Sequence, residues 1–175
     1  MSDLFAVYLL RILHIVIGVF WVGAVLLLSL FLTPSIRAAG PSAGPVLQQL
    51  MVVRALPRWL MAAAVLTLLS GLGLYWRDSG GFQSAAWLGS GPGKTFGLGG
   101  VLGFLAAVVG MAVNAPTARK MTELGTRLQG AGRAPTPEEQ AMLAGYQTRL
   151  TRASNVTTVL LVLATLMMAV ARYVP

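Results

Sequence analysis

Long uncharged apolar runs constrain this sequence more than any other feature. Residues 12–32 form 21 consecutive positions without a formal charge. A helix of that length crosses a hydrocarbon layer about 30 Å thick, because each residue advances the helix by about 1.5 Å. Only 10% of the residues are charged, whereas soluble domains average about 25%. The sequence therefore predicts an integral membrane protein.

Four segments of this kind occur along the chain. The expected membrane-spanning helices cover residues 7–32, 59–76, 95–113 and 153–171. Each is long enough to span a bilayer and too long for an ordinary strand. The predicted fold is therefore all-α: a polytopic protein whose residues 1–175 form one domain, with four transmembrane helices in an up-down bundle.

Lysine and arginine residues are unevenly distributed between the two sides of this bundle. One side carries Arg11, Arg77, Lys94 and Arg172, and the other carries Arg37, Arg54, Arg58, Arg119, Lys120, Arg127, Arg133, Arg149 and Arg152. The positive-inside rule places the richer side in the cytoplasm and both termini outside. The expected location is a bacterial inner (cytoplasmic) membrane, crossed several times. The net charge of +8 thus reflects membrane orientation, and nucleic acid is not an expected partner.

The cytoplasmic connections carry signals of further helix. Residues 46–55 have a helical pattern between two proline-containing turns. Thr136-Pro137-Glu138-Glu139 matches a capping box, with proline at the first helical position. Helices three and four are therefore predicted to extend into the cytoplasm, and Pro116 is expected to kink the end of the third span.

The first span contains the single histidine of the chain, His14. At 100° per residue, Arg11, His14, Gly18 and Trp21 share one stripe of that helix. An ionisable ring at this depth is costly without a partner, so it marks a candidate site. One interpretation is haem b binding, with His14 as axial ligand, Gly18 leaving room for the porphyrin, Trp21 packing on it, and Arg11 or Lys94 meeting its propionates.

Two other interpretations of His14 stay open. The first is a buried neutral imidazole that bonds to a backbone carbonyl or a hydroxyl group of a neighbouring helix. The second is a copper site completed by soft thioether ligands, for which Met167 and Met168 lie at a comparable depth. The chain has no cysteine, which excludes disulfides and thiolate metal sites.

The third span contains a stripe of small residues. It consists of Gly99, Gly103, Ala106, Gly110 and Asn114. Such a stripe lets helices approach closely in lipid, either within the bundle or between copies of the chain. All five acidic residues lie outside the spans, which argues against a proton-coupled transporter.

The pattern His14-x3-Gly18-x2-Trp21-x-Gly23 in a first span, with Lys94 opening the third, resembles a loose superfamily of small bacterial membrane proteins. It includes CopD-like copper-resistance domains, HemJ-type protoporphyrinogen oxidases and uncharacterised four-helix relatives. The resemblance implies His14 as a haem b ligand and Lys94 as a second functional residue.

Three functions follow as expectations. The first is a haem-b-binding or redox-associated inner-membrane protein that uses His14 as ligand. The alternative is a non-catalytic accessory subunit of a larger respiratory or photosynthetic membrane complex. The third is copper handling. The expected partners are the lipid bilayer and either further copies of the chain or a larger membrane complex.

Overall fold

The computed structural model describes residues 2–175, and these residues form helices and connecting turns without a strand. Four helices are long and apolar enough to cross a membrane: Leu4–Ala39, Leu56–Asp78, Gly91–Gly130 and Pro137–Tyr173. The predicted all-α class with four such helices is confirmed. The third and fourth run well beyond the predicted spans.

The first half of the chain is built from one long helix, a compact connection and a second long helix. The elements are α1 (Ser2–Leu27), the π-helical turn η1 (Leu28–Leu32), α2 (Thr33–Ala39), the 3-10 turn η2 (Gly40–Ala43), α3 (Gly44–Gln48), the π-helical turn η3 (Gln49–Val53) and α4 (Leu56–Asp78). The helical stretch expected at residues 46–55 is thus present as α3 and η3.

The second half contains the two longest helical runs. Its elements are α5 (Ala85–Gly89), α6 (Gly91–Val109), the π-helical turn η4 (Gly110–Asn114), α7 (Ala115–Gly130), α8 (Pro137–Val170) and the 3-10 turn η5 (Ala171–Tyr173). The loop between α7 and α8 separates the two long runs.

Two of the π turns accommodate prolines inside long helices. A proline lacks an N–H group, and its ring clashes with the carbonyl four residues earlier. In η1 the amide of Thr33 instead donates to the carbonyl of Leu28, five residues earlier, and Pro34 follows at the next position. Pro116 stands in the same relation to η4. The widened turn therefore lets each helix continue past its proline.

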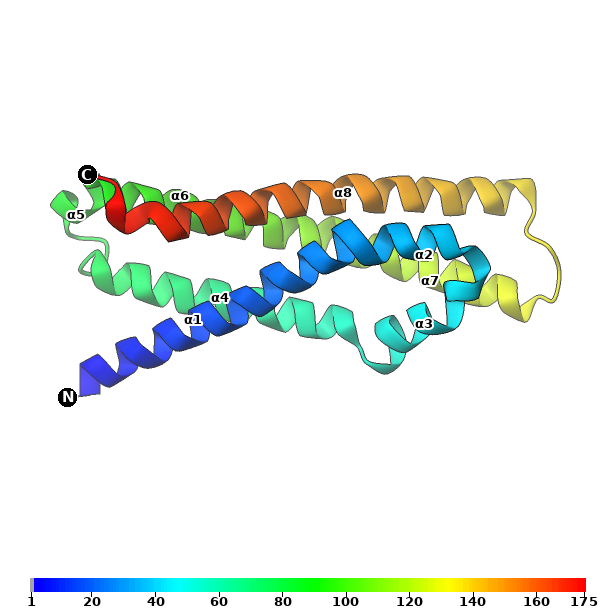
Figure 1. The fold of residues 1–175 in the computed structure, drawn as a ribbon, viewed down its shortest axis with the longest axis horizontal. Coiled ribbons are helices and arrows are strands. Elements are labelled where there is room, and N and C mark those ends of the chain that lie inside the picture. Colours follow the sequence, from blue (N-terminus) through cyan, green and yellow to red (C-terminus); the bar gives the residue numbers. More distant parts are fainter. Residues whose placement is uncertain (1) are drawn as a thin grey trace.

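The long helices run in alternating directions (Figure 1), so that both chain ends and α5 lie at one end of the molecule and α2, α3 and α7 at the other. The closest-packed pairs are α1 with α4 and α6 with α8, and fewer contacts join α4 to α6 and α1 to α8. One buried cluster contains residues from all four helices: Trp21, Ala63, Ala64, Ala106, Ala107 and Leu161. Trp21 is only 5% exposed, so its indole fills the centre of the molecule.

Glycine allows the close contact between α6 and α8. A Cβ atom added at Gly99 would lie 3.0 Å from Met168 Cε, 3.2 Å from Met167 Cβ and 3.4 Å from the carbonyl oxygen of Ala164. Two of these neighbours are close to the α8 backbone and have little freedom to move. At Gly100, one position along, an added Cβ meets nothing within 4 Å. These two glycines therefore form a matched pair on one helix.

We expect Gly99→Ala to destabilise the protein and Gly100→Ala to leave its stability unchanged or raised. The first substitution forces α8 away, at a cost of about 1–3 kcal/mol. The second adds only the helix preference of alanine, worth up to about 1 kcal/mol. Unfolding of the purified variants in mixed micelles measures both. Equal effects of the two substitutions would contradict this close packing of α8 on Gly99.

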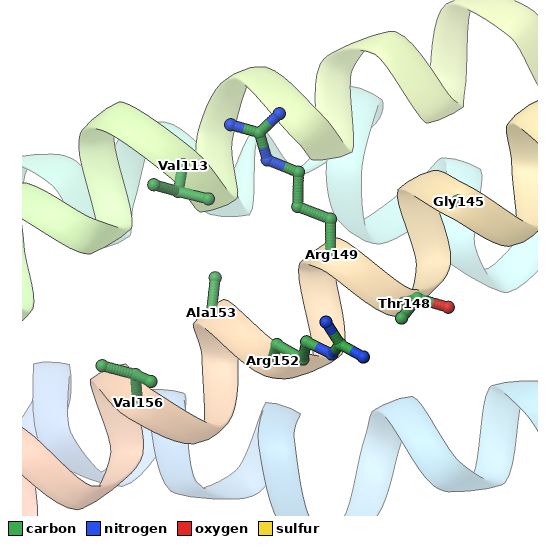
Figure 2. A pocket seen from close by; sticks show the side chains of 7 residues that line it. All are labelled: Val113, Gly145, Thr148, Arg149, Arg152, Ala153 and Val156. Carbon is green, nitrogen blue, oxygen red and sulfur yellow. The ribbon is translucent and has the colours of Figure 1, made fainter.

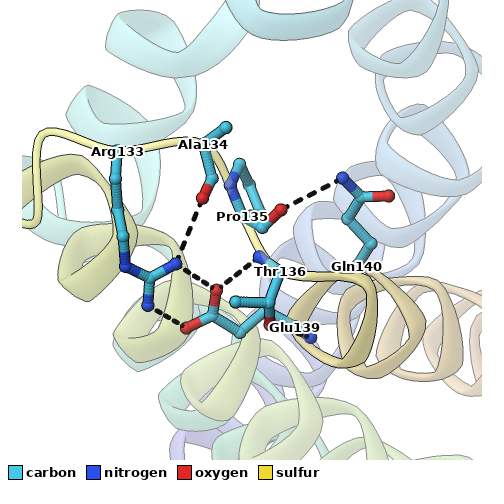
Figure 3. A network of polar contacts seen from close by, with 6 residues as sticks. All are labelled: Arg133, Ala134, Pro135, Thr136, Glu139 and Gln140. Atoms are coloured by element: carbon cyan, nitrogen blue, oxygen red, sulfur yellow. Dashed lines mark hydrogen bonds and ion pairs between the residues drawn. The ribbon is translucent and has the colours of Figure 1, made fainter.

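A polar network fixes the start of α8 (Figure 3). Arg133 donates two hydrogen bonds of 2.8 Å to the two carboxylate oxygens of Glu139. The same carboxylate accepts from the Thr136 amide at 2.8 Å, and the Thr136 hydroxyl accepts from the Glu139 amide at 3.3 Å. This is the capping box expected from the sequence. The pKa of Glu139 is lowered to about 2, mainly by the hydrogen bonds from Arg133 and to a smaller extent by the one from the Thr136 amide.

The lowered pKa makes the start of α8 sensitive to acid. A carboxylate whose pKa falls on folding stabilises the folded state above its unfolded pKa, near 4.5, and loses that contribution as the pH falls towards about 2. Glu139→Gln is therefore expected to speed amide exchange at the start of α8 at neutral pH, with a difference from wild type that shrinks as the pH is lowered from about 4.5 towards 2. Hydrogen exchange corrected for intrinsic rates measures this, with Glu138→Gln as control. A difference that persists unchanged at low pH would mean that charge is not its cause.

Candidate functional site

His14 on α1 is held against the backbone of α4. Its Nδ1 atom lies 2.9 Å from the carbonyl oxygen of Thr67. A carbonyl only accepts hydrogen bonds, so Nδ1 carries the proton and donates. In the neutral ring, the lone pair is then on Nε2. The bond thus selects one tautomer and fixes the orientation of the ring.

Ser70 completes the polar surroundings of the ring. Its hydroxyl group lies 3.5 Å from His14 Nδ1, which is too long for a strong bond. The same hydroxyl donates to the carbonyl of Leu66 at 2.6 Å, so it has no proton left to offer His14. The Thr67 hydroxyl is buried and makes no hydrogen bond to any described residue. The backbone carbonyl is therefore the group that orients the imidazole.

Gly71 provides the space that the imidazole occupies. A Cβ atom added there would lie 2.7 Å from His14 Cε1 and 3.0 Å from Nδ1. On α1, Gly18 likewise leaves space for a side chain of α4: an added Cβ would lie 3.4 Å from the Thr67 methyl group. The two glycines bring α1 and α4 together around the ring.

The second ring nitrogen of His14 has a different environment. Nε2 makes no hydrogen bond to any residue in the described chain, and it is not among the buried polar atoms that lack a partner. It therefore reaches the molecular surface. An imidazole with Nδ1–H bonded to a carbonyl and Nε2 free is the arrangement typical of a metal-ligating histidine.

The structure brings only part of the predicted site together. Arg11 lies one turn from His14 on α1 and is partly buried. Gly18 already faces Thr67, and Trp21 belongs to the central cluster. Lys94 is exposed at the start of α6, a helix that packs mainly on α8 and α4.

The methionines considered for a copper site lie at a different helix contact. Met167 and Met168 face Gly99 between α8 and α6, whereas His14 lies between α1 and α4. The described residues contain no group of three or more His, Cys, Asp or Glu side chains that would hold a metal ion. A single imidazole suits haem iron better than a bare ion, because the porphyrin itself supplies four ligands.

Sequence reasoning missed the contribution of the second long helix. Thr67, Ser70 and Gly71 lie at i, i+3 and i+4, so they share one face of α4. A face that combines a small residue with two hydroxyl groups is a signal for a polar helix contact in a membrane protein. The pattern alone does not name His14 as its partner.

We expect Gly71→Ala to displace His14, since the new methyl group and the ring would overlap. The loss of the Thr67 hydrogen bond and the local repacking together cost about 1–3 kcal/mol. Gly73→Ala is the matched control, because a Cβ there makes ordinary contact with Leu10 at 3.5 and 3.7 Å. Unfolding in mixed micelles compares the two variants. A Gly71→Ala variant as stable as Gly73→Ala would show that the ring is not held in this way.

Comparison with known proteins does not add a family to this geometry. No family model, curated protein or solved structure matches the chain.

Proposed function

We propose that this chain is a four-span protein of a bacterial inner membrane that binds haem b through His14. The observation that carries the proposal is the hydrogen bond from His14 Nδ1 to the Thr67 carbonyl, 2.9 Å long, together with the free Nε2. The carbonyl supports the ring from behind, as outer partners of metal-bound histidines do.

The membrane placement rests on hydropathy and charge. Four helices have the length and composition of spanning segments. The nine lysine and arginine residues of the two connections favour the cytoplasm for the end of the molecule that holds α2, α3 and α7. Both termini then lie outside, and the up-down bundle becomes a transmembrane one. His14 comes to lie in the outer half of the bilayer.

An unpaired imidazole nitrogen at that depth argues for a ligand. A polar group buried in hydrocarbon without a hydrogen bond costs several kcal/mol, about 2–7 by transfer measurements. Thr67 satisfies only one of the two ring nitrogens. Coordination of a haem iron by Nε2 would remove the cost of leaving the second nitrogen without a partner.

The residues around His14 take separate parts in this proposal. His14 would supply a ring nitrogen to the haem iron, and the Thr67 carbonyl fixes the tautomer and orientation of that ring. Arg11 places a cation one turn nearer the outer surface, where a propionate is neutralised, and Lys94 is the second candidate for that role. Haem b, when bound, supplies one-electron redox chemistry. Since Gly18 and Trp21 are already packed, the group would meet the surface of the α1–α4 pair.

We expect purified wild-type protein from haem-replete cells to show a Soret band, with an α-band after reduction by dithionite. His14→Ala is expected to lose both bands, because the chain has no second histidine. Gly71→Ala is expected to lose or shift them through displacement of the ring, and Gly73→Ala to keep them. Colourless wild-type protein that binds no added haem would overturn the proposal.

An accessory subunit of a larger membrane complex is the second candidate. The supporting observation is the exposure of the first long helix, Leu4–Ala39. Only 6% of the residues in its most apolar stretch are buried within the chain, against 17–22% in the most apolar stretches of the other three long helices. A partner subunit and lipid are both suited to that surface. The haem spectrum separates the two candidates, since an accessory role does not require a cofactor at His14.

A further inference from the structure

A groove on α8 (Figure 2) is lined by residues around position 153, where the predicted fourth span begins. It has a volume of about 530 Å³. Its wall contains Val113 of η4 and six residues of α8: Gly145, Thr148, Arg149, Arg152, Ala153 and Val156. The groove lies between α8 and the neighbouring helical run that carries Val113.

The groove is apolar at one end and cationic at the other. Val113, Ala153 and Val156 line the end nearer the proposed membrane centre. Arg149 and Arg152, three positions apart on α8, lie at the other end. In Figure 2 the Arg149 guanidinium group reaches across the gap between the two helices, while Arg152 stays close to α8. The two ends match the acyl chain and the phosphate of a phospholipid.

Neither groove arginine is neutralised by a protein acid. Arg77, Arg119 and Arg133 form ion pairs with acidic residues of the chain. Arg149 and Arg152 form no ion pair or hydrogen bond with any residue that the structure describes. The groove wall itself contains no acidic residue among those described.

A third cation strengthens the positive field of this part of α8. Arg37 of α2 donates hydrogen bonds to the Gln147 carbonyl and the Thr151 hydroxyl group. Its charge therefore lies within one turn of both groove arginines along the helix. Arg37 thus adds a third positive charge to this segment of α8, outside the groove wall itself.

We propose that this groove binds an anionic phospholipid of the cytoplasmic leaflet, with its phosphate held by Arg149 and Arg152 and an acyl chain along Val113, Ala153 and Val156. Guanidinium groups bind phosphate oxygens by paired, charge-assisted hydrogen bonds. A lipid with net negative charge is preferred over a zwitterionic one, because choline offsets the phosphate charge of the latter. The inference rests on the proposed membrane placement and is independent of haem at His14.

A second groove serves as an internal comparison. It has a volume of about 400 Å³ and is lined by Phe20, Leu50, Arg54, Leu56 and Trp59. It has an apolar wall but a single arginine. The nearby pair Arg54 and Arg58 is exposed, so its replacement removes the same charge from the cytoplasmic end and leaves the Arg149 groove intact.

Native mass spectrometry of the detergent-purified full chain tests the proposal. The probes are phosphatidylglycerol and phosphatidylcholine with identical acyl chains. We expect wild-type protein to bind phosphatidylglycerol at least about tenfold more tightly than phosphatidylcholine, and Arg149→Gln/Arg152→Gln to lose that preference. Arg54→Gln/Arg58→Gln should retain most of it. Val156→Trp, which fills the apolar end at an exposed position, should weaken both lipids.

Three outcomes would overturn the proposal. Retention of the preference by Arg149→Gln/Arg152→Gln would remove these residues from lipid binding. An equal loss in Arg54→Gln/Arg58→Gln would mean that the overall charge of the cytoplasmic end, and not the groove, selects the lipid. The third outcome has two parts: millimolar inorganic phosphate displaces phosphatidylglycerol, and Val156→Trp binds both lipids as tightly as wild type. That result would indicate a site for soluble phosphate. The haem spectrum of each variant is a separate readout, so failure at one site does not imply failure at the other.

Discussion

The close approach of helix backbones over small side chains is the constraint on which this structure depends. Lipid is as apolar as leucine, so burial of apolar surface provides little force between helices in a bilayer. Van der Waals contact must replace it, and contact requires small residues at the crossing points. Alanine pairs on α4 and α6 surround the Trp21 indole, and Gly99 lets α8 rest against α6. One large ring thus fills a space enclosed by very small neighbours.

The same constraint creates the surroundings of His14. Gly71 admits the ring only because it has no side chain, and the close approach brings the ring within reach of the Thr67 carbonyl. A carbonyl in a regular helix already accepts a backbone bond, but its second lone pair stays available. The helix contact therefore both packs the imidazole and sets its tautomer.

Local sequence patterns predicted the elements of the fold but not their partners. Hydropathy and length located the four long helices, and Thr136 with Glu139 identified the start of α8, because these signals lie within one segment. Arg11, His14, Gly18 and Trp21 were predicted to form one surface. In the structure Trp21 enters the buried core, whereas His14 contacts α4. A single helix does not encode which neighbour each turn will face. The π turns before Pro34 and Pro116 were also missed. A helix can relieve the clash with a proline ring either by a kink or by a widened turn, and the sequence does not distinguish the two.

The length of α8 has a mechanical consequence. Its 34 residues extend for roughly 50 Å at 1.5 Å per residue, and in the proposed membrane placement a hydrocarbon core would cover about 30 Å of that length. The remainder is an unbroken rod with a firmly capped tip, and Arg37 ties the first connection to its flank. In the proposed membrane placement, a partner bound at the α7–α8 tip would be held at a fixed height above the bilayer. Tilting of α8 within the membrane would then displace that tip laterally, because the helix is continuous over its whole length.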